Sequence, residues 1–143
     1  TVAIDLASAW VGQQTVVVEK QQERAIPYAG FSAARLSGIP TVVLVDGGSA
    51  SASEILAGAL QDYNLATVVG EQTFGKGSVQ ELIPVTSDSS LKVTIAKWLT
   101  PKHKSLVDNG LDPDILVKAA TTTTATSTDP VLLRAIDFLK QKK

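Results

Sequence analysis

The sequence predicts an α/β domain, because short apolar strands alternate with amphipathic helices along the chain. The clearest strand is the apolar run at Thr41–Val45, and a helix with one apolar face follows it at Ser51–Tyr63. The length of 143 residues, with 44% hydrophobic and 19% charged residues, is typical of a chain that builds its own core.

The first third of the chain is predicted to hold one helix and two strands. Apolar residues recur at helical spacing from Ala3 to Trp10, so a helix ending near Gly12 is expected. The β-branched run Thr15–Glu19 indicates a strand, and Ala25–Ala29 indicates a weaker partner that its proline keeps at a sheet edge. The strand at Thr41–Val45 is apolar throughout, which favours a strand covered on both faces.

The later elements are predicted from turn residues that interrupt the apolar runs and from the alternation of residues along the strands. A short strand is expected at Thr67–Val69, a glycine-containing loop at Glu71–Gly77, and a hairpin formed by Ser78–Val85 and Leu91–Leu99. The polar segment Pro101–Pro113 is predicted to be a long connection.

We divide the chain into a core at 1–120, a Thr-rich linker at 121–128 and a terminal helix at 129–143. Asp129 supplies the cap of this helix and Pro130 its first position.

The amino-acid composition excludes several classes of function. Thirteen basic and fourteen acidic residues leave a net charge of -1, which gives no electrostatic basis for nucleic-acid binding. No apolar run reaches the roughly 20 residues of a membrane helix. The absence of cysteine excludes disulfides, thiolate metal sites and a cysteine nucleophile.

No cofactor or metal site is expected from the sequence. There is a single histidine, so no histidine pair supports zinc binding. Asp108, Asp112 and Asp114 surround Gly110 without the spacing of a calcium loop, which indicates a plain acidic loop.

The most informative segment is the strand, turn and helix between Val43 and Leu60. A helix start presents free N–H groups and the positive end of a dipole, beside which a serine hydroxyl meets donors for an oxyanion. Ser49, Ser51 and Ser53 all lie there, and either helix capping or nucleophilic chemistry accounts for them. Glu54, in the first helical turn, is expected to be structural.

A serine nucleophile needs a base. His103 lies between two lysines in a polar segment, which indicates a solvated loop. Lys76 is flanked by two glycines, and Gln80 shares its face if the segment is extended. A lysine acts as base only after losing its proton, which burial in a dry pocket promotes. The alternative is a solvated lysine and a surface glutamine.

These motifs together resemble the C-terminal processing peptidases, also called tail-specific proteases. The resemblance covers residues 38–115, with a serine 25 residues before the lysine and a glutamine four after it. The matching segments are Gly48–Ile55, Ala57–Leu60, Gly70–Gln80, Leu99–Pro101 and Gly110–Asp114.

The resemblance implies a core related to the crotonase and Clp protease folds, with a mixed sheet and packed helices. It implies Ser51 as nucleophile, Lys76 as general base, Gln80 as the residue orienting the lysine, and the Ala52 N–H as an oxyanion donor. It also implies proteolysis near nonpolar C-terminal tails, in the bacterial envelope, periplasm or exterior, or in a plastid lumen.

Two parts of the family pattern are absent from these 143 residues. The family has an Arg-Asn-x-x-Gly-Gly turn before the first helix, which supplies a second oxyanion donor, and a PDZ module that recognises the substrate tail. The chain begins at Thr1 and contains no methionine, so we expect an N-terminally truncated piece with weak or no activity by itself. The missing strand is expected to leave an unpaired edge that favours self-association.

Two other functions remain open. A non-catalytic module of the same fold would hold a peptide against a sheet edge. A crotonase-type acyl-CoA enzyme ranks last, because Ser51, Lys76 and Gln80 have no evident role in that chemistry.

Overall fold

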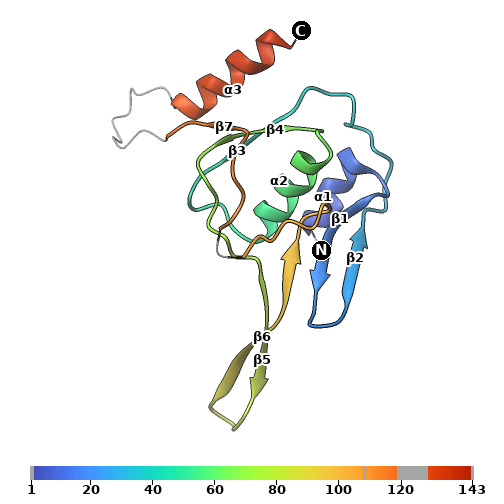
Figure 1. Ribbon diagram of the computed structural model, residues 1–143, viewed down its shortest axis with the longest axis vertical. Helices are drawn as coiled ribbons and strands as arrows, with labels where there is room; N and C mark the ends of the chain where they lie inside the picture. The colour runs from blue at the N-terminus through green and yellow to red at the C-terminus, as the bar shows by residue number, and fades with distance from the viewer. Residues whose placement is uncertain (1, 108, 119–128, 143) are drawn as a thin grey trace.

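The computed structural model describes residues 2–107, 109–118 and 129–142. The linker expected at 121–128 lies outside the described residues. The predicted α/β class is confirmed, with antiparallel and parallel strands in two separate sheets (Figure 1). The elements are α1 (Val2–Val11), β1 (Thr15–Lys20), β2 (Ala25–Ala29), β3 (Val42–Val45), α2 (Ala52–Asp62), β4 (Thr67–Gly70), β5 (Ser78–Pro84), β6 (Ser90–Leu99), β7 (Ile115–Leu116) and α3 (Pro130–Gln141).

The antiparallel sheet has the strand order β2-β1-β6-β5. The strand predicted from the β-branched run is β1, and its residues 16–19 are buried. Its last three residues pair with β6, with Val18 opposite Leu99. The proline-containing strand β2 forms one edge of the sheet, as predicted, because proline cannot donate to a second neighbour.

The second sheet is parallel and has the order β3-β4-β7. Val42 pairs with Thr67 at one end of β3 and Val45 with Gly70 at the other. The expectation that this strand is covered on both faces is wrong, because Leu44 is 42% exposed. Within the described residues β3 has a neighbour only on its β4 side, so its other edge is unpaired.

Two helices lie between the sheets and form the core with them. α1 and α2 pack against each other and against β1, and α2 also contacts β4 (Figure 1). Small residues on α2 allow the close approach, since Ala57 and Ala59 are fully buried beside Leu60. α3 packs on β3 and β4 and is capped by Asp129, whose side chain accepts hydrogen bonds from the N–H groups of the helix start. This packing fixes the N-terminus of α2 next to the end of β3.

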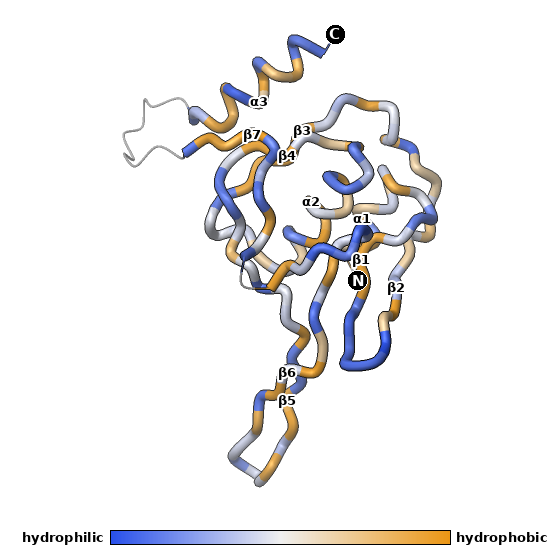
Figure 2. The backbone as a smooth tube through the Cα atoms, in the orientation of Figure 1, coloured by the Kyte–Doolittle hydropathy of each residue, from blue (hydrophilic) through white to orange (hydrophobic). Residues whose placement is uncertain are grey.

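The hairpin of β5 and β6 extends away from the body of the molecule (Figure 1). It has hydrophobic residues along both strands (Figure 2), and Leu82 is 65% exposed. A register shift between Val79 and Gln80 marks a bulge near its base. The exposed apolar side chains of the hairpin region are Leu82, Ile83, Val85, Leu91 and Ile95.

Candidate active site

The turn between β3 and α2 is held by its own polar side chains. The Asp46 carboxylate accepts hydrogen bonds from Gly48 N–H and from the Ser49 hydroxyl, both at 3.0 Å. The Ser49 hydroxyl oxygen in turn accepts from Asp46 N–H at 3.1 Å. The Ser49 hydroxyl is therefore occupied in shaping the turn, which leaves it a structural neighbour of Ser51.

Ser51 has a strained backbone at the start of α2. Its φ of 56° and ψ of -110° place an L-residue in a region that few non-glycine residues occupy. Strain of this kind at a sharp strand-to-helix turn is the feature that exposes the nucleophilic serine of α/β-hydrolases. Ser51 is exposed, and the next residue, Ala52, begins the helix. In the part of the chain that is described, the Ala52 N–H has no hydrogen-bond acceptor, so it is free to act as an oxyanion donor.

The lysine lies in a loop that glycines bring close to a neighbouring segment. A side chain on Gly77 would come within 2.5 Å of the Leu106 backbone, so only glycine fits there. Lys76 forms an isolated antiparallel bridge with Val107 on the same segment. Gly75, with φ of 87°, makes the turn that precedes it. The Gly-Lys-Gly sequence is thus explained by backbone packing against residues 106–107.

One buried carboxylate connects the serine turn to the lysine loop. Glu54 is fully buried, and its Oε2 accepts from Ser51 N–H at 2.8 Å and from Lys76 N–H at 3.0 Å. Its Oε1 accepts from the Thr73 hydroxyl at 2.6 Å and from Gly75 N–H at 2.7 Å. Glu54 therefore holds together the two segments that carry the predicted nucleophile and the predicted base.

Sequence reasoning placed Glu54 in the first helical turn but did not find this role. The signal was present, since serine followed three residues later by glutamate is the capping-box pattern. The pattern accounts for the bond to Ser51 N–H. The three donors from residues 73–76 are a product of the tertiary fold.

The structure brings the backbones of Ser51 and Lys76 together, but it does not join their reactive atoms. Among the described residues no hydrogen bond links Ser51 Oγ to Lys76 Nζ. Lys76 is exposed, so the expected burial of this lysine in a dry pocket is not observed. Gln80 is exposed on β5, and its amide donates to the Thr94 hydroxyl at 3.5 Å rather than contacting the lysine. His103 is exposed in a turn, as predicted from its flanking lysines.

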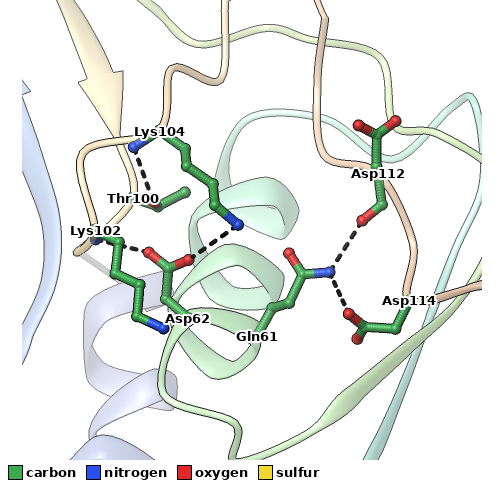
Figure 3. A network of polar contacts seen from close by, with 7 residues as sticks. All are labelled: Gln61, Asp62, Thr100, Lys102, Lys104, Asp112 and Asp114. Atoms are coloured by element: carbon green, nitrogen blue, oxygen red, sulfur yellow. Dashed lines mark hydrogen bonds and ion pairs between the residues drawn. The ribbon is translucent and has the colours of Figure 1, made fainter.

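The opposite end of α2 carries a second polar network (Figure 3). Asp62 is 2% exposed, accepts from Lys102 N–H at 2.7 Å, and lies 3.6 Å from the Lys104 amine. Gln61, one residue earlier, donates from its amide to the Asp112 carbonyl and to the Asp114 carboxylate. The sequence offered no partner for Asp62, because the main partner is a backbone N–H distant in the chain.

Asp112 and Asp114 of the predicted acidic loop help to line a cleft of about 530 Å³ at this end of the helix, and Asp108 lies outside the described residues. Asp114 also accepts from Val68 N–H at 2.7 Å, and Asp112 accepts from the Gln72 amide at 3.0 Å. These carboxylates bind protein donors. In the described ranges no group of three or more acidic, histidine or cysteine side chains is arranged to hold a metal ion. None of the described helices is long and apolar enough to cross a membrane.

A strained serine between a strand and a helix, followed by a free N–H, is the arrangement of the nucleophile in α/β-hydrolases, and lysine is the base for serine in some other hydrolytic enzymes. The model of peptidase family S41 matches residues 1–117. The chain belongs to this family, and its resemblance to the C-terminal processing peptidases is confirmed by individual relatives.

Relatives occur in bacteria and in a plant. The carboxyl-terminal-processing protease of Synechocystis is 43% identical over 141 residues, which is 95% of this chain and 33% of the relative. The chloroplastic carboxyl-terminal-processing peptidase 3 of Arabidopsis thaliana is 41% identical over 114 residues, covering 78% of this chain and 22% of the relative. The chain thus spans about a third or less of the length of these curated relatives.

A solved structure supports the same assignment. The photosystem II D1 C-terminal processing protease superposes with a TM-score of 0.73 at 34% sequence identity. The match covers 80% of this chain and 30% of that chain. The fold described above is therefore that of part of a C-terminal processing protease.

Proposed function

We propose that this chain is the catalytic core of a serine endopeptidase that cleaves protein substrates near nonpolar C-terminal tails. Ser51 is the nucleophile, Lys76 the general base, Gln80 the residue that orients the lysine, and the Ala52 N–H one oxyanion donor. The observation that carries the proposal is the Glu54 carboxylate, which binds the N–H groups of both Ser51 and Lys76. The capping box accounts for the bond to Ser51 N–H, and the bond to Lys76 N–H joins the start of the helix to the segment that carries the proposed base.

The reaction proceeds through an acyl-enzyme. Ser51 Oγ attacks the scissile carbonyl carbon while its proton passes to the uncharged amine of Lys76, and the negative oxygen that forms is bound by Ala52 N–H. The C–N bond then breaks, and Lys76 returns the proton to the departing amine. Water then attacks the ester carbon while Lys76 takes its proton. As the ester C–O bond breaks, Lys76 gives this proton to Ser51 Oγ, which releases the acid and restores the serine hydroxyl and the uncharged amine.

Lys76 is exposed, and its side chain has to reach the Ser51 hydroxyl for this reaction. Substrate would exclude water above the Ser51 turn and move the Lys76 side chain toward it, while the backbone of the loop stays fixed by Glu54 and Val107. We further propose that other parts of the protein supply a second oxyanion donor and a PDZ module that binds the substrate tail. The isolated chain is accordingly weak or inactive.

The test uses Ser51→Ala and Lys76→Ala in the full-length protein. The substrate is a disordered polypeptide that ends in alanine, valine and leucine. Both variants are expected to lose turnover while keeping the circular dichroism spectrum and melting temperature of the wild type. Wild-type turnover in either variant would refute the Ser/Lys assignment.

A second candidate function is a non-catalytic module that binds an extended peptide at a sheet edge. It is favoured by the free outer edge of β5 in the described residues and by the exposed apolar side chains of its hairpin. Binding of the same polypeptide without cleavage, unchanged by Ser51→Ala, would support this function over proteolysis.

We also propose the setting in which the protein works. By analogy with its bacterial and chloroplastic relatives, it acts in the bacterial envelope, periplasm or exterior, or in a plastid lumen. The unpaired edge of β3 favours self-association of the isolated chain. Cell fractionation tests the first proposal and sedimentation at several concentrations tests the second.

A further inference from the structure

We propose that Glu54 is a positioning residue of the active site, and that the Thr73 hydroxyl fixes the rotation of its carboxylate. Glu54 sets the separation between the Ser51 turn and the Lys76 loop. This inference rests on the proposed function, because it assumes that Ser51 and Lys76 react with one another.

The hydrogen bonding of Glu54 is saturated. A carboxylate offers about four acceptor positions, and Glu54 uses four, two on each oxygen. Among the described residues it forms no ion pair, so these four donors compensate for the burial of its charge. Removing one donor segment would leave the charge incompletely solvated, and the carboxylate therefore opposes separation of the two segments.

Thr73 determines which way the carboxylate faces. Its hydroxyl oxygen accepts from Leu111 N–H at 2.7 Å, so its own proton is directed to Glu54 Oε1 at 2.6 Å. Thr73 is itself fixed, because its N–H donates to the Leu111 carbonyl at 3.1 Å. With Oε1 held by Thr73 and Gly75, Oε2 is aimed at the N–H groups of Ser51 and Lys76.

The strained backbone of Ser51 gives this contact its importance for catalysis. Residues at such φ and ψ values persist only where their surroundings impose them, and the N–H bond to Glu54 is such a constraint. If the bond is lost, Ser51 relaxes and its hydroxyl moves relative to Lys76. A displacement of about 1 Å is enough to cost on the order of 100-fold in rate.

The primary variant is Glu54→Gln in the full-length protein, with the same disordered polypeptide as substrate. Glutamine keeps the size of the side chain, but its amide group turns two hydrogens toward N–H donors. We expect kcat to fall by about 100-fold and KM to change by less than about threefold, since Glu54 is fully buried and holds the backbone of the two residues that react. Glu23→Gln, in the exposed turn between β1 and β2, is the matched control and should retain wild-type kcat.

Thr73 supplies a second, independent pair of variants. Thr73→Val keeps the shape and removes the hydroxyl, whereas Thr73→Ser keeps the hydroxyl. We expect kcat to fall by roughly 10-fold in the valine variant and to return to within about threefold of wild type in the serine variant. This pair decides the question if Glu54→Gln does not fold.

The outcomes separate this inference from the proposed function. Loss of turnover in Ser51→Ala with wild-type kcat in Glu54→Gln would overturn the positioning role and leave the proteolytic function intact. Equal kcat values for the two Thr73 variants would also overturn it. Retained turnover in Ser51→Ala would remove the proposed function, and the positioning role with it.

Discussion

Ser51 and Lys76 donate their backbone N–H groups to the same oxygen atom, Oε2 of Glu54. The two residues are far apart in sequence, and a second bond, from Phe74 N–H to the Ser49 carbonyl, joins the same two segments. The backbone of the proposed site is thus assembled in the described chain, although no hydrogen bond joins the Ser51 and Lys76 side chains there.

Glu19 should stabilise the fold at neutral pH but not in acid. Hydrogen bonds from the Gln21 amide and the Tyr28 hydroxyl lower the pKa of Glu19 from its ordinary value of 4.5. A carboxyl with a lowered pKa in the folded state contributes stability above its unfolded pKa, and this is lost as the pH falls through the folded pKa. Urea unfolding at pH 7 and pH 3 should therefore show a Glu19→Gln difference that shrinks in acid. A difference that grows in acid would contradict this.

The hydrogen bond from the Lys102 N–H to Asp62 should contribute more to the free energy of unfolding than the ion pair between Asp62 and Lys104 does. Asp62→Ala leaves the Lys102 N–H without its acceptor and is expected to cost about 1–3 kcal/mol in the free energy of unfolding. Asp62→Asn keeps an acceptor oxygen and should cost less. The Lys104 side chain is 62% exposed, so Lys104→Ala should cost less than about 1 kcal/mol. Urea titrations of the three variants give the order, and an equal loss in all three would show that the ion pair dominates.

Gly70 cannot carry a side chain without separating β3 from β4. Its φ is 138°, and a Cβ there would lie 1.8 Å from the Val45 carbonyl oxygen. Gly70→Ala is expected to cost more than about 3 kcal/mol, since it combines backbone strain with a clash that side-chain movement cannot relieve. Gly38→Ala is the control, because nothing lies within 4 Å of its Cβ position. Thermal melts followed by circular dichroism compare the two, and similar melting temperatures would contradict the prediction.

Most of the fold was predictable because the elements have strong local patterns. The helix at α2 and the hairpin of β5 and β6 were placed to within a residue or two from periodicity and turn residues. β7 was missed, since its two residues are too few to show a period and are held by pairing with β4. The exposure of Leu44 was also missed, because an apolar run does not reveal what covers it.

The candidate site was predictable only in part. Spacing and resemblance indicated Ser51 and Lys76, but no local pattern predicted that their backbones share an acceptor. The partners of Glu54 include backbone N–H groups, and any residue other than proline supplies one. For the same reason the sequence did not predict the hydrogen bond from the Lys102 N–H to Asp62. Whether Lys76 is buried or exposed depends on which other segments pack against its loop, and the local sequence does not specify those segments.

The two acids at the ends of α2 also constrain how this protein can evolve. Glu54 anchors the first turn to residues 73–76, and Asp62 anchors the last turn to residue 102. An insertion or deletion of one residue between them would rotate one anchor about 100° around the helix axis relative to the other. Exposed side chains of this helix can therefore change during evolution, but its length is fixed by its two attachments.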